Sequence, residues 1–323
     1  MQYLHTQLIP QDAVCRVAMI GAGYMAREHL KAFADIRQVR LVGITSRTKS
    51  RAEALAQEFG ISLVVENIAE LADLKPHLVI ITVNAEHVHK VVAECCSYPW
   101  TILTEKPVGM NLHQYMDTMA IVKSSKARVF IALNRRLHAS TRCLLTELQQ
   151  CQGPRFIEVF DQQEPKRLRQ LNRQIDDLEL AFSNSIHTID FISFLGRGEI
   201  SSVRPALPWK GQRTLAVAAS VNFTSGDMGM YHAVWNAPGP WAVFVTTHEK
   251  RFELRPLENL AIQPMGKRVL DEITLSDIDI RFKPGLRIQS EEAVKAALGL
   301  DNCCSSLADA RRTMELIDAI YAK

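Results

Sequence analysis

The 323-residue sequence lacks an apolar run long enough to cross a membrane, and it lacks a strong excess of either charge. Lys and Arg number 38 against 35 for Asp and Glu, which gives a net charge of +3. So balanced a composition does not favour nucleic acid or an anionic membrane as a partner. Residues 1–12 also lack the basic and apolar regions of a signal peptide. We therefore expect a soluble, cytoplasmic protein.

Cysteine is scarce and irregularly spaced. The chain has seven cysteines, with adjacent pairs at 95–96 and 303–304 and no Cys-x-x-Cys spacing. The odd number argues against a disulfide framework, and the missing spacing argues against a zinc site. We expect reduced, mostly buried thiols and no bound metal.

The first part of the chain contains a regular alternation of strand and helix patterns. Such alternation is typical of a parallel, doubly wound α/β sheet, so we expect a dinucleotide-binding Rossmann domain over 1–134. Gly60 follows a helical stretch and is a plausible C-cap. The expected strands are 14–20, 39–45, 63–65, 78–83, 100–104 and 129–133, and the expected helices are 25–33, 49–59, 86–96 and 112–124.

From about residue 135 the pattern changes. Strand-like runs follow one another without regular helices between them, which predicts an α+β domain over 135–323 with a mostly antiparallel, open sheet. The expected strands are 156–160, 215–223, 229–236, 241–247 and 251–256, and helices at 291–297 and 307–321 close the chain. The last helix could pack back on the first domain. Trp209, Trp235 and Trp241 are expected to pack on the sheet or at a subunit contact, with a sugar-stacking wall as the alternative.

A glycine-rich turn follows the first expected strand. Residues 21–26 read Gly-Ala-Gly-Tyr-Met-Ala, a G-x-G-x-x-A sequence that leads into a helix. Gly21 permits the tight turn, Gly23 lets the backbone approach a pyrophosphate, and Ala26 allows close helix–strand packing. The free N–H groups of the helix start would then face the phosphates.

The end of the second expected strand indicates which nucleotide binds. An NAD enzyme usually carries an acidic residue there for the ribose hydroxyls. Residues 45–49 instead read Thr-Ser-Arg-Thr-Lys, with no carboxylate. Ser46 and Arg47 can bind a 2′-phosphate, so NADP is favoured over NAD. The alternative is a solvated basic loop, with the cofactor decided elsewhere.

Glu105, Lys106 and Pro107 follow the strand expected at 100–104. Ligands of open parallel sheets bind beyond the carboxyl ends of the strands, so a lysine at this position is well placed to touch a substrate. The proline restricts the conformation of Lys106 and can also be cis. The alternative is a solvated turn.

Together, these motifs resemble the Gfo/Idh/MocA family of sugar oxidoreductases, over nearly the whole chain. Further matches are His29, the run 84–87, the run 134–136, and 282–285 with Gln289. The resemblance implies that the second domain binds substrate and forms a homodimer or homotetramer. The implied cofactor-binding residues are Gly21, Gly23, Tyr24, Met25, Ser46, Arg47, Asn84, His87, Glu105 and Lys106.

The resemblance also assigns catalytic roles. Lys106 would polarise the oxygen of the reacting C–O bond and relay a proton if burial lowers its pKa, and His187 would be the general base in oxidation or the acid in reduction. Ser183 and Arg136 would contact substrate. The family's motif Asp-x-Gly-x-His-x-x-Asp keeps His187 and Asp190, but Ser183 replaces the first aspartate and a serine replaces the glycine.

The loss of that aspartate leaves alternatives open. Asp176, Asp177 or Glu179 could fold in to replace it, and Asp190 is expected to be structural. The leading hypothesis is an NADP-preferring dehydrogenase or reductase of a sugar, polyol or nucleotide-sugar. A second is a nucleotide-binding sensor or regulator without catalysis. A third is a reductase of a non-sugar carbonyl or imine, which would not need a carboxylate beside the histidine.

Overall fold

The computed structural model describes residues 7–170 and 176–321. The chain divides into two compact units, and each is described by itself. The first unit contains residues 1–137 and 277–309, and the second contains 138–276 and 310–323. The predicted second domain, 135–323, differs from this division, because residues 277–309 belong to the first unit.

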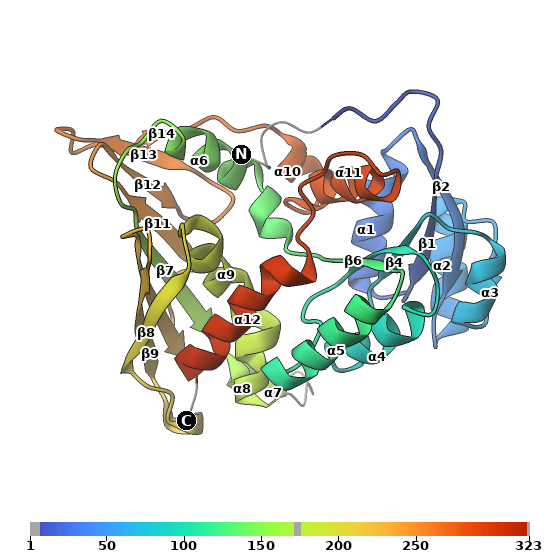
Figure 1. The fold of residues 1–323 in the computed structure, drawn as a ribbon, viewed down its shortest axis with the longest axis horizontal. Coiled ribbons are helices and arrows are strands. Elements are labelled where there is room, and N and C mark those ends of the chain that lie inside the picture. The colour runs from blue at the N-terminus through green and yellow to red at the C-terminus, as the bar shows by residue number, and fades with distance from the viewer. Residues whose placement is uncertain (1–6, 171–175, 322–323) are drawn as a thin grey trace. The chain divides into compact units, whose positions relative to one another are not determined.

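The first unit is built on a six-stranded parallel sheet with strand order β3-β2-β1-β4-β5-β6 (Figure 1). This order is that of a Rossmann fold. The strands are β1 (Cys15–Ile20), β2 (Val39–Thr45), β3 (Val64–Val65), β4 (Leu78–Ile81), β5 (Thr101–Thr104) and β6 (Arg128–Ile131). The helices are α1 (Tyr24–Ala34), α2 (Lys49–Phe59), α3 (Ile68–Asp73), α4 (Ala85–Cys95), α5 (Leu112–Ser124), the 3₁₀ helix η1 (Asn134–Leu137), α10 (Ile278–Arg281) and α11 (Leu286–Ala297).

The strands of this sheet end at a common edge. Ile20 pairs with Ile81, and Ile81 with Thr104. All residues of β4 and β5 are buried, as expected for apolar strands covered on both faces. Parallel strands in this register place the turns that follow β1, β4 and β5 at one edge, where an open sheet binds ligands.

The sequence located these strands to within two residues at each end, and it located α2 and α5 to the residue. Gly60 has the left-handed conformation, with φ of 64°, and caps α2 as predicted. The short helix α3 was not expected.

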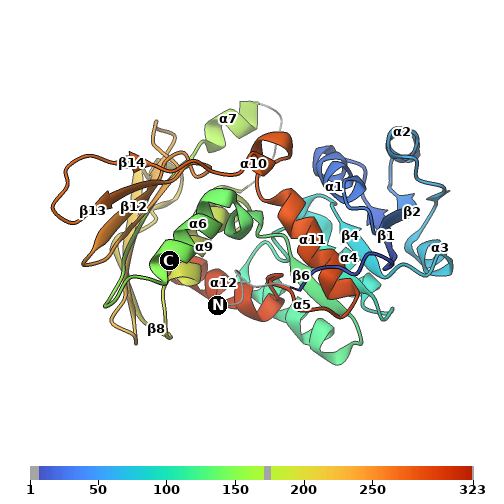
Figure 2. The ribbon, with the colours of Figure 1, turned by 90° about the horizontal axis from the view of Figure 1, so that it is seen from above.

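Helix α11 completes the first unit from the far end of the sequence. It lies alongside α1 (Figure 2) and also contacts β4 and β5. Its residues Ala293 and Val294 belong to the same buried cluster as Leu30 and Phe33 of α1. Lys295 is also buried there, and its Nζ donates to Glu292 at 2.7 Å. The segment therefore supplies part of the hydrophobic core of the first unit.

The second unit is built on an eight-stranded mixed sheet with order β14-β13-β12-β11-β7-β10-β9-β8. Its neighbours are antiparallel except β7 and β10, which are parallel. The strands are β7 (Phe156–Gln163), β8 (Ile200–Leu207), β9 (Ala216–Phe223), β10 (Met228–Trp235), β11 (Ala242–Thr246), β12 (Lys250–Leu254), β13 (Ala261–Pro264) and β14 (Asp271–Glu272). The helices are α6 (Ala139–Leu148), α7 (Pro165–Gln170), α8 (Asp177–Leu180), the π-helical η2 (Ala181–Ser185), α9 (Ile186–Leu195), the 3₁₀ helix η3 (Gly211–Arg213) and α12 (Leu307–Tyr321), which begins in the first unit.

Helix α9 packs on β7, β10 and β11, and it covers one face of this sheet. Alternation along β7 is regular, with Ile157 and Val159 buried on the helix side and Phe156 and Phe160 half-buried on the other. Trp235 is buried in β10 and packs against Trp209, with ring centroids 4.4 Å apart and ring planes tilted by 52°. The indole N–H of Trp241 donates to the carbonyl of Gln162 at 3.0 Å. The expected packing of these tryptophans on the sheet agrees with these contacts.

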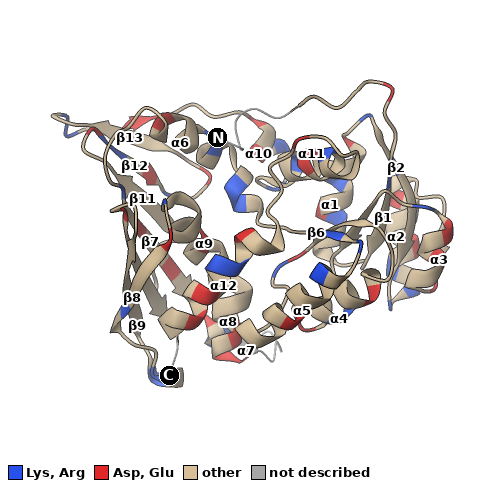
Figure 3. Cartoon of the chain, viewed as in Figure 1, with Lys and Arg blue, Asp and Glu red and all other residues tan. Residues whose placement is uncertain are grey.

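Charged side chains of both signs are dispersed over the elements of each unit (Figure 3). All seven cysteines carry free thiols, and burial raises the pKa of Cys15 to about 12. Within 7–170 and 176–321, none of the helices combines the length and the hydropathy that a membrane span requires.

Candidate functional site

The turn after β1 requires glycine at its first position. Gly21 has φ of +111°, a conformation that side chains rarely adopt. A Cβ at this position would lie 2.7 Å from both the carbonyl oxygen and the Oγ1 of Thr82. The Gly21 N–H donates to the carbonyl of Thr45 at 2.8 Å, which ties the turn to the end of β2. The turn is therefore fixed between β2 and β4.

Gly23 is required by neither packing nor backbone conformation. It is the N-cap of α1, it has φ of −94°, and a Cβ there would have no atom within 4 Å. No side chain caps α1, and its first turn carries no acidic residue. Open space in front of uncapped N–H groups fits a pyrophosphate, because the helix dipole and the free donors both favour an anion.

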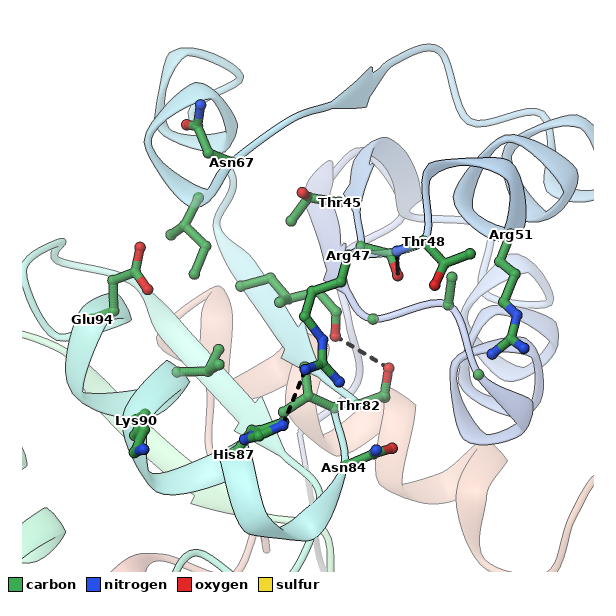
Figure 4. Close-up of a pocket in the computed structure, with 18 of the residues that line it drawn as sticks. Thr45, Arg47, Thr48, Arg51, Asn67, Thr82, Asn84, His87, Lys90 and Glu94 are labelled. Atoms are coloured by element: carbon green, nitrogen blue, oxygen red, sulfur yellow. Dashed lines mark hydrogen bonds between the residues drawn. The ribbon is translucent and has the colours of Figure 1, made fainter.

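The turn opens into a pocket of about 550 Å³ (Figure 4). Its walls come from the glycine turn, the ends of β2 and β4, the residues after β3, and one face of α4. The predicted residues that line it are Gly21, Gly23, Ser46, Arg47, Asn84 and His87. Further lining residues that the sequence reading did not single out are Thr45, Thr48, Arg51, Glu66, Asn67, Thr82, Lys90 and Glu94.

Two signals could have found some of these residues. Thr82 follows β4 as Gly21 follows β1, and its hydroxyl donates to the carbonyl of Ile20 at 3.2 Å. In α4, His87, Lys90 and Glu94 recur at spacings of three and four residues, so they share one helix face.

Arg47 extends from the end of β2 across the pocket to α4 (Figure 4). Its Nη1 lies 3.1 Å from Nε2 of His87. Ser46 Oγ accepts from the backbone N–H of Thr48 at 3.3 Å. Acidic residues of the pocket come from elsewhere, Glu66 after β3 and Glu94 in α4. The end of β2 therefore presents a guanidinium where a carboxylate would bind ribose hydroxyls.

Tyr24 and Met25 do not line this pocket. The ring of Tyr24 is 67% exposed, and Lys283 Nζ lies 5.6 Å from its centroid. Met25 packs instead against the small cluster of Ala32, Phe282 and Leu286. Both residues contact the segment that leads into α11.

Glu105 and Lys106 lie at the end of β5, with a cis peptide bond between Lys106 and Pro107. The Glu105 N–H donates to the carbonyl of Ile81, at the end of the neighbouring β4, at 2.8 Å. The Glu105 carboxylate lies 2.9 Å from Nε2 of His29. The side chain of His29 is 1% exposed and that of Glu105 is 12% exposed.

Lys106 is half-buried, and its pKa is lowered from an ordinary 10.5 to about 8. Burial is the main cause, because it removes water from the ammonium. The charge of Glu105 opposes the change, whereas the charges of Arg135 and Lys283 add to it. A lysine with this pKa exchanges a proton near neutral pH.

The run 134–136 forms η1, which packs on α11. Asn134 Nδ2 donates to the carbonyl of Pro284 at 2.8 Å. Arg136, predicted to contact substrate, is buried, and its Nη1 donates to Ser305 Oγ at 3.3 Å. Within the first unit, Arg136 therefore has a packing role.

In the second unit, Ser183 lies in the π-helical turn η2, and His187 lies in the first turn of α9. Such turns are rare and often occur at functional positions. Asp190 is buried and accepts from Thr313 Oγ1 of α12 at 2.7 Å. Asp190 was expected to be structural, and its contact with Thr313 ties α9 to α12.

A buried polar network, which the sequence did not indicate, supports η2. The Gln163 amide N–H group donates to Asp161 Oδ1 and to Ser185 Oγ, at 2.9 Å each, and Gln163 Oε1 accepts from Asn184 Nδ2 at 2.8 Å. The Tyr231 hydroxyl donates to Asp161 Oδ2 at 2.7 Å. Burial raises the pKa of Asp161, although these hydrogen bonds oppose the change. The network fixes the orientation of Asn184, beside Ser183.

Two of the three acidic residues that could replace the missing aspartate are engaged in a helix cap. Asp176 and Glu179 form a capping box at the start of α8, with Asp176 Oδ1 accepting from Leu178 N at 2.8 Å and Glu179 Oε2 from Asp176 N at 3.2 Å. Asp177 takes no part in the capping box, and it is 5% exposed. It lies in α8, which directly precedes η2.

Comparison with known proteins identifies relatives. Residues 15–133 match the sequence model of the Gfo/Idh/MocA family, described as an oxidoreductase family with an NAD-binding Rossmann fold. The chain is 26% identical over 122 residues to inositol 2-dehydrogenase of Rhizobium meliloti, a match that covers 38% of this chain and 36% of that protein. It is 28% identical over 116 residues to glucose-6-phosphate 3-dehydrogenase of Bacillus subtilis, covering 36% and 31%. The match thus spans about a third of the length of each of these relatives.

Similarity over the whole chain comes from solved structures. UDP-N-acetylglucosamine 3-dehydrogenase from Acidithiobacillus ferrooxidans superposes with a TM-score of 0.77, covers 95% of this chain and 96% of its own, and is 18% identical. At this level of identity, the likeness establishes a shared fold for both units.

Proposed function

We propose that this chain, whose residues 15–133 match the Gfo/Idh/MocA oxidoreductase family, is an NADP-preferring dehydrogenase of a sugar, polyol or nucleotide-sugar. The observation that carries the proposal is the open, uncapped start of α1 at Gly23, beside a pocket whose β2 edge presents Arg47. Pyrophosphate would bind at the start of α1, and the 2′-phosphate of the adenosine ribose would bind at Arg47.

Preference for NADP rests on charge. Arg47 and Arg51 both line the pocket, and residues 45–49 contain no carboxylate that would repel a phosphate. Ser46 and Thr48 add hydroxyl groups at the same edge. NAD lacks the 2′-phosphate that Arg47 and Arg51 would bind, so its affinity should be lower than that of NADP.

Lys106 is the residue that we expect to exchange the proton of the reacting hydroxyl. The nicotinamide, when bound, carries the hydride. Neutral Lys106 would accept the hydroxyl proton in oxidation, and its ammonium would return a proton to the carbonyl oxygen in reduction. A pKa of about 8 makes both forms available. By the family resemblance, His187 remains an acid–base candidate, to be tested separately.

The substrate class is inferred from the relatives, whose names refer to a cyclic polyol and to two sugars. Ser183 favours a second candidate, a nucleotide sensor without turnover, because a serine cannot supply the charge that stabilises an imidazolium. A reductase of a non-sugar carbonyl or imine would also tolerate Ser183.

Assembly and location belong to the same proposal. The sheet face of the second unit that α9 does not cover carries half-buried Phe160 and His232, whose rings stack 4.9 Å apart. Phe244 packs on Phe160 and is itself covered by Arg251, 4.7 Å from its ring centroid. Such a face suits a homodimer or homotetramer. The seven free thiols suit the reducing cytoplasm.

The test is a fluorescence titration of wild type and Gly23→Ala with NADPH and NADH. The added methyl group meets open space, so Gly23→Ala should keep its melting temperature and lose at least ~10-fold in affinity, since it fills the position a pyrophosphate needs. Failure of the wild type to bind either nucleotide would contradict the proposal. Turnover on a panel of sugars and polyols then separates enzyme from sensor. A sensor would bind nucleotide without turnover and gain activity in Ser183→Asp, whereas an enzyme would lose its turnover in Lys106→Ala.

A further inference from the structure

His29 is a buried polar residue for which the proposed reaction has no direct use. It lies in α1, two turns after the glycine turn, and its residue exposure is 0%. Nε2 lies 2.9 Å from Oε1 of Glu105. The ring stacks loosely on Phe33, with centroids 6.4 Å apart and planes 24° apart. A fully buried imidazole therefore joins the helix of the glycine turn to the residue before Lys106.

The surroundings of His29 favour one protonation state. Nδ1 is buried and has no hydrogen-bond partner among the described residues. An imidazolium would leave an N–H donor buried without an acceptor, which is costly, whereas the neutral Nε2–H tautomer leaves only a lone pair. The neutral ring then donates to an ionised Glu105 carboxylate. The hydrogen bond thus holds the carboxylate in place without neutralising its charge.

The charge of Glu105 acts on Lys106, the next residue. The charge of Glu105 favours the Lys106 ammonium, whereas the charges of Arg135 in η1 and of Lys283 disfavour it. Of the basic residues in the α10–α11 segment, Arg281 and Arg287 pair with Asp35, whereas Lys283 lies over the ring of Tyr24 in α1. His29 is the residue of α1 that is hydrogen-bonded to Glu105.

We propose that His29 is a positioning residue for Lys106, which it reaches by holding the Glu105 carboxylate in one orientation. The proposal rests on the role of Lys106 in the proposed function. The hydrogen bond from His29 keeps Oε1 directed toward α1. Without it, the carboxylate is free to turn to the adjacent ammonium and form a closer ion pair, which would keep Lys106 protonated to higher pH.

The proposal is tested by measuring the titration of Lys106 itself, through the pH dependence of its labelling by trace acetic anhydride, read by mass spectrometry. This readout requires no substrate turnover, so failure of the proposed activity and failure of the proposed positioning are separate results. His29→Leu should move the Lys106 midpoint up by about half a pH unit or more. Glu105→Gln removes the negative charge and should move it down. His29→Gln can still donate from its amide and should restore the wild-type midpoint.

Phe33→Leu is the control, because it disturbs the same buried face of α1 and leaves the hydrogen bond intact. It should lower stability without moving the midpoint. If the variants retain turnover, the pH profile of kcat should shift in the same directions as the labelling, with KM for the nucleotide changed less than two-fold. A His29→Leu midpoint equal to that of the wild type would overturn the proposal, as would equal shifts in His29→Leu and Phe33→Leu. If His29→Leu fails to fold, the other two variants decide. The proposal is then supported if the Lys106 midpoint in His29→Gln equals that of the wild type and the midpoint in Glu105→Gln is lower. An unmoved midpoint in Glu105→Gln overturns it.

Discussion

Arg47 and His87 are hydrogen-bonded across the nucleotide pocket, with 3.1 Å between Nη1 and Nε2. A guanidinium can only donate, so Nε2 of His87 accepts and the ring is neutral in this arrangement. The guanidinium is therefore already held over the pocket, by a contact that a more strongly charged acceptor can replace. A 2′-phosphate is such an acceptor.

The first prediction concerns this contact. Arg47→Ala should weaken NADPH binding roughly 10- to 100-fold, since hydrogen bonds to a charged group are worth about 1.5–3 kcal/mol. NADH affinity should change less than about three-fold, because NADH has no 2′-phosphate. Ser46→Asp should favour NADH by placing a carboxylate at the same edge. Equal losses for both nucleotides in Arg47→Ala, measured by fluorescence titration, would show that this residue does not select the cofactor.

The second prediction concerns pH. Lys106 has a pKa of about 8, so the rate of alcohol oxidation should rise as pH increases through 8, while the rate of carbonyl reduction should fall. Lys106→Arg keeps a charge but stays protonated at these pH values, so it should lose at least ~100-fold in both directions. Stopped-flow hydride transfer from pH 6 to 10 measures both limbs, and a flat profile would exclude Lys106 as the proton exchanger.

The variant Lys106→Met is a control that separates a loss of proton transfer from a loss of stability. The pKa of Lys106 is lower in the folded protein than in the unfolded chain. The charged ammonium therefore destabilises the fold below about pH 8, and this cost disappears above about pH 10.5. Lys106→Met removes that charge and should unfold at an equal or higher denaturant concentration than the wild type at pH 7. At pH 10.5 the difference should shrink.

The third prediction compares adjacent acids. Asp177→Asn should lower turnover at least ~10-fold if its buried carboxylate replaces the aspartate missing at Ser183. Asp176→Ala removes a helix cap and should cost about 1 kcal/mol of stability, with turnover within about two-fold. Steady-state kinetics and urea unfolding of the two variants distinguish these effects. Unchanged turnover in Asp177→Asn would show that the Asp177 carboxylate does not assist His187.

The fourth prediction concerns the packing of α9. Thr313→Val keeps the shape of the side chain but removes the donor to buried Asp190. Leaving that acceptor short of a hydrogen bond should cost about 1–3 kcal/mol. Thr313→Ser keeps the hydroxyl and should recover most of the loss. The midpoint of urea unfolding measures the difference, and equal midpoints for Val and Ser would mean that this hydrogen bond does not stabilise the unit.

The sequence predicted most of what is local. The strands and the turn of the first unit were found because buried apolar runs, Gly21 and the cap at Gly60 each have a local signal. In the second unit the family motif at His187 implied a helix, but periodicity did not give the bounds of α9, because nearly all of its ten residues are buried and this conceals the helical period. Strand β8 was missed because it is a largely exposed edge strand that contains Pro205.

Contacts distant in sequence could not be predicted. His29 was recognised as a matching residue, but its partner Glu105 is 76 positions away and becomes evident only in the folded unit. The hydrogen bonds that link Gln163 to Asn184 likewise join a strand to a turn through side chains with no shared local pattern. The proposed preference for NADP, by contrast, follows from local residues at the end of β2.

Part of the core of the first unit is translated last. Residues 1–137 leave the ribosome well before α11, whose Ala293 and Val294 complete the core against α1. Until then, the buried cluster that contains Leu30 and Phe33 lacks the residues that α11 supplies, while the intervening 138–276 is being made. The nucleotide-binding unit should therefore reach its native state only after synthesis has passed residue 309, and a fragment that stops at 137 should need chaperones or a supplied α11 peptide to stay in solution.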